Sequence, residues 1–95
     1  MRFRFTATAE RDIEEIGDYI ARDNPARAVS FIEELTEKCH RLVEHPAVAP
    51  LRPEFGDGVR MMPFGRYLIF YSFGTDELII IRVIHGARNR STGLD

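Results

Sequence analysis

The hydrophobic and polar residues along the chain change their spacing several times, and each change indicates a new element of secondary structure. Residues 2–7 alternate polar and apolar side chains, which is the period of a half-buried strand whose inner face carries Phe3 and Phe5. The sequence therefore predicts a β-strand over these residues.

After this strand the apolar residues recur every three or four positions, which is typical of a helix with one buried stripe. Thr8 is the expected N-cap, because a threonine hydroxyl can accept a hydrogen bond from a free backbone N–H of the first turn. Glu10 and Asp12 are expected in that turn, where the positive end of the helix dipole favours negative charge. The buried stripe should consist of Ala9, Ile13, Ile16 and Ile20.

A second helix is predicted from Asn24-Pro25 to His45-Pro46, since asparagine caps helices and proline suits the first helical position. The two helices should form a hairpin. Cys39 falls on the apolar side of the second helix, so we interpret it as a small core residue rather than a reactive thiol. The stripe is expected to comprise Ala28, Phe31 or Ile32, Leu35, Cys39 and Leu42.

Proline and glycine punctuate the chain from Pro46 to Gly58, which predicts a connecting loop. Three strands rich in β-branched and aromatic residues are expected after it, because the apolar runs are short and bounded by turn residues. The connections between these strands are short enough for tight turns, so the strands should form an antiparallel meander. The predicted strands cover residues 59–62, 67–73 and 78–85.

These elements define an α+β fold class, β-α-α-β-β-β, in which an antiparallel sheet packs on the two-helix hairpin. A chain of 95 residues suits one domain, residues 1–95. The last two strands are apolar at successive positions, 68–71 and 78–81, and therefore on both faces. The hairpin can cover only one face. Curvature of the sheet, the carboxy-terminal tail or a partner chain must cover the other.

The charges are distributed unevenly, although the net charge is only -2. Residues 1–57 carry 8 Lys and Arg against 12 Asp and Glu, a net charge of -4, whereas residues 58–95 carry 5 against 3, a net charge of +2. Every basic residue of the second part is an arginine, whose planar guanidinium suits carboxylates and phosphates. These arginines are either a recognition set or solvated edge residues: Arg60, Arg66, Arg82, Arg88 and Arg90.

The cysteine and histidine content argues against several kinds of site. One cysteine cannot form an internal disulfide, and His40, His45 and His85 show no metal-binding spacing, so we predict neither a metal ion nor a cofactor. The amino terminus lacks the apolar stretch of a secretion signal, and no apolar run is long enough to span a membrane. The sequence predicts a soluble, cytoplasmic protein without membrane contacts.

Several short motifs follow one another in an informative order. They are Asp12-Ile13, Tyr19-Ile20, Asn24-Pro25, Arg52-Pro53-Glu54-Phe55, Val59-Arg60, Pro63-Phe64, Tyr67-Leu68-Ile69-Phe70-Tyr71 and Ile81-Arg82-Val83-Ile84-His85-Gly86-Ala87-Arg88. Through them, over about residues 8–88, the chain resembles the ParE branch of the ParE/RelE toxin superfamily, whose members are toxins of type II toxin–antitoxin systems.

The resemblance implies the β-α-α-β-β-β toxin fold and a cognate antitoxin. That antitoxin would be ParD-like, a ribbon-helix-helix DNA-binding dimer whose tail wraps the toxin through helix-in-groove and strand-addition contacts. Such a tail would supply the cover that the second sheet face needs. The toxin alone is not expected to bind a specific DNA sequence.

The superfamily has two activities, and its RelE branch consists of ribosome-dependent mRNA endoribonucleases. Arg60 and Arg82 match the phosphate-holding arginines of that branch, and His85 matches a general acid or base of some members. Against this activity, Gly86-Ala87 stands where a tyrosine is needed and residues 47–66 contain no lysine. An isoelectric point of about 5.9 also suits a polyanionic ribosome poorly.

ParE toxins instead trap DNA gyrase with cleaved DNA, which requires no catalytic residues. The resemblance therefore favours a non-enzymatic gyrase poison neutralised by its antitoxin, and a non-toxic module that only binds an antitoxin is a third alternative. The predicted gyrase contacts are Arg60, Arg82, His85, Arg88 and Arg90. A competing structural interpretation makes Arg60 and Arg82 buried partners of carboxylates such as Glu54, and makes His85 a strand-end residue bonded to backbone.

Overall fold

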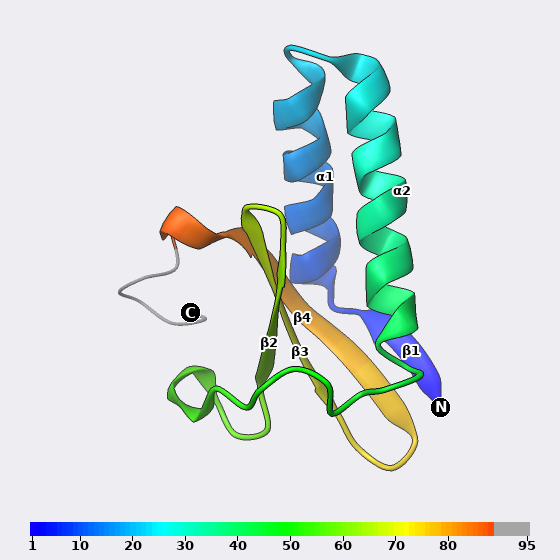
Figure 1. Cartoon of the computed structure of the whole chain (residues 1–95), viewed down its shortest axis with the longest axis vertical. Helices are drawn as coiled ribbons and strands as arrows, with labels where there is room; N and C mark the ends of the chain where they lie inside the picture. Colours follow the sequence, from blue (N-terminus) through cyan, green and yellow to red (C-terminus); the bar gives the residue numbers. More distant parts are fainter. Residues whose placement is uncertain (89–95) are drawn as a thin grey trace.

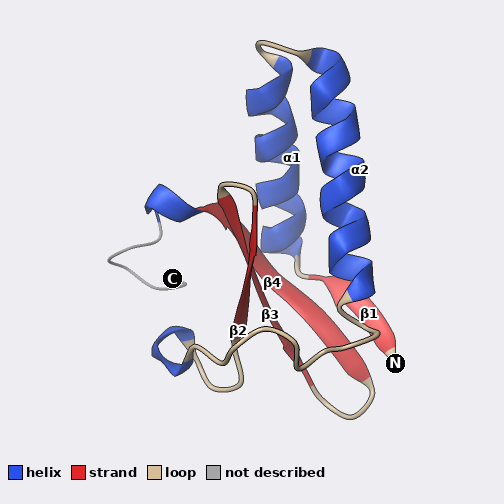
Figure 2. Ribbon diagram, in the orientation of Figure 1, coloured by secondary structure: helices blue, strands red, loops and turns tan. Residues whose placement is uncertain are grey.

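The computed structural model describes residues 1–88, and Figures 1 and 2 show their arrangement. Strand β1 (Arg2–Phe5) leads into two adjacent helices, α1 (Ala7–Ala21) and α2 (Pro25–Arg41). A long loop with a 3-10 turn (Pro53–Phe55) precedes the strands β2 (Arg60–Phe64), β3 (Tyr67–Phe73) and β4 (Glu77–His85), and a second 3-10 turn follows (Gly86–Arg88). The predicted order of elements is confirmed. Neither helix of this described part is long and apolar enough to cross a bilayer.

The four strands lie in the order β1-β4-β3-β2. Strands β2, β3 and β4 form the predicted antiparallel meander, and Gly65 adopts a φ of 59° in the tight turn that places Phe64 opposite Tyr67. Strand β1 pairs parallel with β4, with Phe3 beside Leu78, so the sheet is mixed rather than wholly antiparallel. The sequence could not specify this pairing, because no tight turn joins β1 to its neighbour.

Helix α1 begins earlier than predicted, because Thr6 rather than Thr8 is its N-cap. The Thr6 hydroxyl accepts a hydrogen bond from the Ala9 N–H at 2.9 Å and donates one to the Ile81 carbonyl of β4 at 2.8 Å. Thr8 is exposed on the first turn. The prediction for Thr8 was wrong, since only Thr6 can cap the helix and bind the sheet at once.

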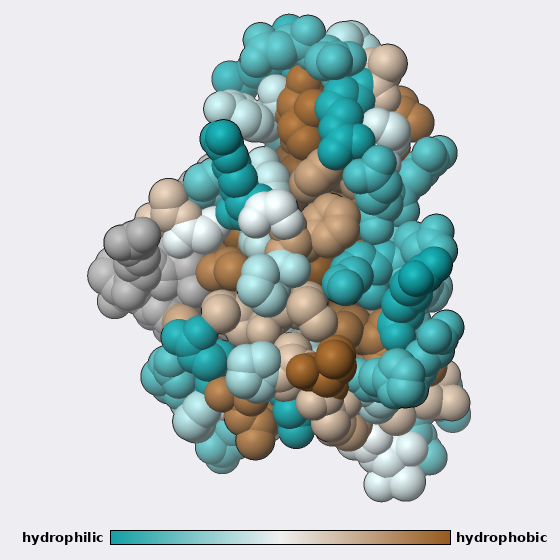
Figure 3. All heavy atoms as spheres, in the orientation of Figure 1, coloured by the Kyte–Doolittle hydropathy of each residue, from teal (hydrophilic) through white to brown (hydrophobic). Residues whose placement is uncertain are grey.

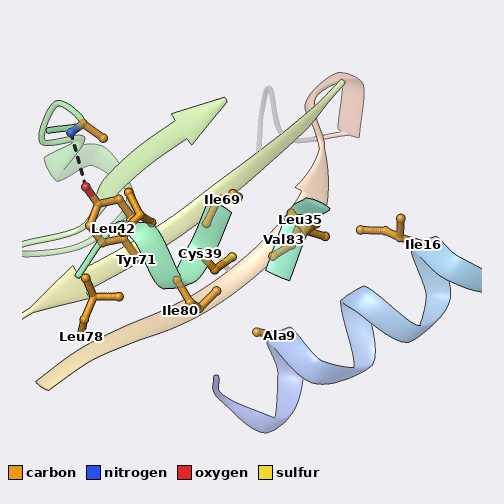
Figure 4. Close-up of a cluster of buried hydrophobic side chains, with 11 residues drawn as sticks. Ala9, Ile16, Leu35, Cys39, Leu42, Ile69, Tyr71, Leu78, Ile80 and Val83 are labelled. Carbon is orange, nitrogen blue, oxygen red and sulfur yellow. Dashed lines mark hydrogen bonds between the residues drawn. The ribbon is translucent and has the colours of Figure 1, made fainter. Parts of the chain in front are cut away.

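One hydrophobic core lies between the helical hairpin and the sheet (Figure 4). The predicted helical stripes are confirmed as its helical side, with Leu35 and Cys39 of α2 fully buried. Burial raises the pKa of Cys39 to about 12, so the thiol stays protonated, as expected of a core residue. The core residues contributed by the sheet are Ile69, Tyr71, Leu78, Ile80 and Val83.

The second face of the sheet is covered in part by the long loop. Phe70 belongs to this face and is fully buried, because the Phe55 ring packs against it with the centroids 5.1 Å apart. Arg52 lies over the Phe55 ring at 5.2 Å and pairs with Glu54 at 2.7 Å. The sequence indicated this segment only as a connector. Other apolar residues of this face remain half-buried: Leu68, Ile79 and Ile84.

Apolar and polar side chains occupy different parts of the molecular surface. In the view of Figure 3, apolar side chains run down the middle of the molecule, from between the two helices to the sheet below. Hydrophilic side chains cover the outer side of α2 in the same view. Acidic residues of this helix account for them in part, since Glu33, Glu34 and Glu37 are exposed.

Tyr71 anchors the loop that follows α2. Its buried ring carries a hydroxyl that donates to the Pro46 carbonyl at 2.7 Å and accepts from the Ala49 N–H at 3.4 Å. Burial raises the pKa of Tyr71, which keeps this hydroxyl protonated. Arg60 of β2 donates to the carbonyls of Ala47 at 3.3 Å and Ala49 at 2.7 Å. The start of the loop is therefore held from two strands.

Removal of the Tyr71 hydroxyl should destabilise the fold. In Tyr71→Phe, the Pro46 carbonyl and the Ala49 N–H lose their partner in a buried site, which should lower the free energy of unfolding by about 1–3 kcal/mol. Urea denaturation followed by circular dichroism measures the change. The matched control is Tyr19→Phe, at a ring that is 65% exposed, with an expected change below about 0.5 kcal/mol. Equal stability of the two variants would contradict the anchoring role.

Candidate functional site

A pocket of about 370 Å³ lies between α1 and the end of the sheet where β3 begins and β4 ends. Two of the predicted site residues, Arg82 and His85, line this pocket, which we call the α1–β4 pocket. The other polar and aromatic residues that line it are Asp12, Glu15, Tyr19, Arg66 and Tyr67. Of these, only Arg66 belonged to the arginines that the sequence indicated as a possible recognition set.

Of the other predicted site residues, Arg60 does not join this pocket. It pairs with Tyr71 across β2 and β3, far along the register from the pair of Tyr67 and His85. Arg88 ends the last 3-10 turn, but its side chain lies outside the described part, as does all of Arg90. Of the three predicted site residues whose side chains the structure describes, it therefore brings together two.

Arg82 is bound to Asp12, a carboxylate of α1 that is only 8% exposed. The guanidinium Nε donates to Oδ2 at 2.8 Å and Nη2 donates to Oδ1 at 3.0 Å, so the pair is bidentate. Its hydrogen bonds with Asp12 raise the pKa of Arg82, which keeps the guanidinium charged. Asp12 also accepts the Val83 backbone N–H at 3.0 Å. The Asp12 carboxylate thus accepts hydrogen bonds from the Arg82 side chain and from the backbone of β4.

The position of Asp12 follows from the shortness of β1. Strand β1 ends at Phe5, so the remainder of β4 has no neighbouring strand on that side. The Thr6 hydroxyl bonds to the Ile81 carbonyl there, and Asp12 accepts the N–H of Val83 further along β4. Helix α1 thereby takes the place of β1 along the edge of β4.

Arg82 binds a carboxylate, as the structural interpretation held, but two details of our interpretation of charged residues were wrong. Glu54 pairs with Arg52 and does not bind Arg60 or Arg82, because the 3-10 turn places the Glu54 carboxylate beside its near neighbour in sequence. Asp12 does not lie in the first turn, since α1 begins at Ala7. Asp12 lies between Ala9 and Ile16 on the apolar stripe itself, and a carboxylate at such a position needs a buried donor. That spacing was the signal that could have identified the pair.

His85 bonds to backbone, as the structural interpretation held. Its Nδ1 accepts a hydrogen bond from the Ala87 N–H at 3.1 Å, so the neutral ring carries its proton on Nε2. The ring also meets Tyr67 edge to face, with centroids 5.3 Å apart. In this state Nε2–H can donate a hydrogen bond, while the Nδ1 lone pair accepts the Ala87 N–H.

Charged and aromatic side chains line the α1–β4 pocket. Carboxylates of α1 lie on one side, arginines and His85 on the other, and two tyrosines complete the wall. Within residues 1–88, no group of three histidine, cysteine, aspartate or glutamate side chains is placed to hold a metal ion. Its chemistry is therefore hydrogen bonding and aromatic contact.

Loss of the Asp12 carboxylate should destabilise the protein strongly. Asp12→Ala leaves the Arg82 guanidinium and the Val83 N–H without this acceptor, so we expect the free energy of unfolding to fall by about 2–4 kcal/mol. Asp18→Ala removes an exposed carboxylate of the same helix and should change it by less than about 0.5 kcal/mol. Thermal and urea unfolding of the two variants provide the comparison, and a loss below about 1 kcal/mol for Asp12→Ala would argue against the pair as a structural tie.

A helical hairpin tied to a mixed four-stranded sheet in the order β-α-α-β-β-β is the architecture of the ParE/RelE toxin superfamily. Residues 3–90 match the family model of the ParE toxin of the type II toxin–antitoxin system, parDE. The chain belongs to the ParE toxin family.

Two solved structures resemble the chain over most of its length. The chromosomal ParDE toxin–antitoxin system from P. aeruginosa has a TM-score of 0.78 at 20% identity, covering 90% of this chain and 95% of that one. The toxin–antitoxin complex RelBE2 from Mycobacterium tuberculosis has a TM-score of 0.65 at 27% identity, covering 88% and 95%. No curated protein matches the sequence significantly.

Proposed function

We propose that this chain is a toxin that poisons DNA gyrase by binding and that a cognate ParD-like antitoxin holds it inactive. Membership of the ParE toxin family supports the proposal. One observation of the site carries it: the groups that an endoribonuclease would use are already bonded within the protein.

The two arginines that match the nuclease branch have structural partners. A nuclease site must direct donors at the charge that develops on the scissile phosphate. Arg82 directs Nε and Nη2 at Asp12, and Arg60 directs Nη1 at the carbonyls of Ala47 and Ala49. To direct these same donors at a phosphate, each arginine would have to break these bonds. We therefore assign Arg60 and Arg82 to holding the fold.

His85 is suited to donating a hydrogen bond and unsuited to proton transfer. A general base needs a free lone pair, and a general acid needs a protonated ring, whose Nδ1–H would face the Ala87 N–H. The neutral ring of the structure offers one donor, Nε2–H. We therefore assign His85 to contact with the target, together with the predicted contacts Arg88 and Arg90.

The antitoxin part of the proposal is supported by the incompletely covered sheet. Leu68, Ile79 and Ile84 stay half-buried although the loop covers Phe70 on the same face. Such a surface suits burial by another chain. The proposal treats residues 1–95 as one toxin domain and places it in the cytoplasm, where gyrase and antitoxin would meet it.

One observation favours the ribonuclease alternative. Tyr67, Arg82 and His85 line the same pocket, so Tyr67 stands close to where the nuclease branch needs an aromatic residue. The alternative requires the bonds of Arg82 to Asp12 to open during turnover. It is therefore the second candidate, and the target assay separates the two.

Purified toxin should cause gyrase to leave its DNA substrate cleaved. We expect linear plasmid to accumulate when the toxin is added to gyrase, ATP and supercoiled DNA and the reaction is stopped with detergent and protease. A parallel reaction with translating ribosomes and a defined mRNA should leave the message intact. Codon-linked cuts in the message without DNA breaks would establish the ribonuclease instead, and the absence of both signals would leave only an antitoxin-binding module.

The role of His85 can be tested by two substitutions that differ in one donor. The amide N–H of His85→Gln can replace the imidazole Nε2–H, so this variant should keep most of the gyrase poisoning, whereas His85→Ala should lose about 5-fold or more. If His85 instead transferred protons in a ribonuclease, both variants should lose about 100-fold or more of the mRNA cleavage. Titration of toxin in the plasmid cleavage assay measures the ratio. Equal and large losses would contradict a donor role.

A further inference from the structure

Two charged side chains of the α1–β4 pocket have no partner within the part of the chain that the structure describes. Asp12 and Arg82 bind each other, so their charges are neutralised. Among the described residues, no hydrogen bond or ion pair involves the Glu15 carboxylate or the Arg66 guanidinium. His85 also keeps its Nε2–H as a donor. One acceptor and two donors are therefore available to a bound molecule.

The two donors, Arg66 and His85, lie side by side at one wall of the pocket. Tyr67 follows Arg66 in the sequence and pairs with His85 across β3 and β4. The Gly86 N–H then donates to the Arg66 carbonyl at 2.8 Å. A Cβ at Gly86 would lie only 3.3 Å from this carbonyl oxygen, so glycine permits the close approach of the two segments. This contact holds the two donors together.

Helix α1 provides the acceptor and an exposed ring on the other wall. Glu15 follows Asp12 by three positions, which places both carboxylates on one face of the helix. The hydrogen bonds with Asp12 are the main cause of the raised pKa of Arg82, and the nearby charge of Glu15 contributes to it. Tyr19 lies one turn further along α1 and is 65% exposed. The Arg22 guanidinium lies over its ring at 5.8 Å, which leaves the opposite ring face for a planar group.

A simple ion fits this pocket poorly. The formal charges of its lining cancel, because Asp12 and Glu15 oppose Arg66 and Arg82. An anion bound at Arg66 would face the Glu15 carboxylate, and a cation bound at Glu15 would face the Arg66 guanidinium. A neutral planar molecule with acceptors on one edge and donors on another satisfies both walls. The pocket volume of about 370 Å³ lies in the range of small-molecule sites.

Guanine is the nucleobase that carries this arrangement of donors and acceptors. Its O6 and N7 are the acceptors to which arginine side chains commonly donate. Its N1–H and N2 amino group are adjacent donors, which suit the two oxygens of a carboxylate. Adenine, cytosine and thymine each lack such a pair of adjacent donors. Since N1 and N2 belong to the edge that pairs with cytosine, the guanine must be unpaired.

We propose that the α1–β4 pocket binds an unpaired guanine base. Glu15 accepts from N1–H and N2–H, Arg66 and His85 donate to O6 and N7, and the base stacks on the ring of Tyr19. The assignment of this base to DNA rests on the proposed poisoning of gyrase, since a base beside a strand break leaves the stack at a lower cost than one in an intact duplex. Toxin bound to that base hinders its return to the duplex, and so hinders resealing of the break.

The charge of the protein determines how such binding should behave. A net charge of -2 provides little attraction to phosphates, so the base itself must supply most of the affinity. Binding to an isolated oligonucleotide should therefore be weak and should depend little on salt. In the cell, contact with gyrase would bring the toxin to the DNA.

Titration of the toxin with labelled single-stranded oligothymidine that contains one guanine tests the proposal without gyrase. Matched oligonucleotides carry hypoxanthine, which lacks the N2 amino group, or 7-deazaguanine, which lacks the N7 acceptor. Fluorescence anisotropy should give a Kd at least about 5-fold lower for guanine than for either analogue, because each analogue loses one hydrogen bond. An RNA strand of the same sequence provides the comparison between the two sources of guanine.

Substitution of Glu15 provides the second measurement. Glu15→Gln keeps the shape of the side chain but has one acceptor oxygen, so the Kd for guanine should rise about 5-fold or more while the Kd for hypoxanthine changes little. The matched control is Glu14→Gln, at an exposed carboxylate of α1 that does not line the pocket, and it should bind like the original chain. Both substitutions are at exposed positions, so thermal unfolding should show the same stability.

The possible outcomes separate this proposal from the one on which it rests. Equal affinity for guanine and its analogues, or no binding at about 1 mM oligonucleotide, overturns the guanine assignment and leaves the gyrase proposal standing. Guanine-dependent binding of RNA without binding of DNA overturns the assignment to DNA. Guanine-dependent binding by a toxin that does not affect gyrase supports the pocket assignment and overturns the gyrase proposal.

Discussion

The bond between Asp12 and Arg82 joins the helical hairpin to the sheet at the point where β1 stops. Beyond Phe5 the edge of β4 would face no strand, and the Asp12 carboxylate supplies an acceptor for both the guanidinium and the Val83 N–H. An ion pair between two largely buried charges adds little to the stability of a fold. Removal of one partner nevertheless destabilises the fold, because the other charge stays buried without it. The pair therefore fixes where α1 lies along β4, and with it the wall of the α1–β4 pocket.

The bond between Asp12 and Arg82 changes how the resemblance of Arg82 to the arginines of the nuclease branch is interpreted. An arginine at the position of Arg82 suggests phosphate binding when only the sequence is considered, yet its partner here is a carboxylate of the same chain. Arg60 likewise holds the loop after α2, and Nδ1 of His85 holds a backbone N–H. In this structure all three residues therefore serve contacts within the protein. The family membership identifies a toxin of a type II toxin–antitoxin system.

Hydrophobic spacing was sufficient to predict both helices, the three-strand meander and most of the core, because those features follow from local periodicity. It could not choose between Thr6 and Thr8 as the cap, since both can cap a helix and only the Ile81 carbonyl of β4 decides between them. The parallel pairing of β1 and the packing of Phe55 on Phe70 also depend on contacts between segments distant in the sequence. In the site, the sequence identified Arg82 and His85 by their resemblance to the superfamily. It included Arg66 only among the arginines of a possible recognition set. It missed Asp12, Glu15, Tyr19 and Tyr67, because only the tertiary fold brings these residues together.

Contacts from outside the strands also complete the edges of the sheet. Asp12 completes one end of β4, and residues 50–52 close the edge of β2. The account depends most on the claim that Arg82 serves the fold through Asp12. A double-mutant cycle with Asp12→Ala and Arg82→Ala, measured by urea unfolding, tests that claim most directly. The account predicts a coupling free energy of about 2 kcal/mol or more between the two residues, and a coupling below about 0.5 kcal/mol would contradict it.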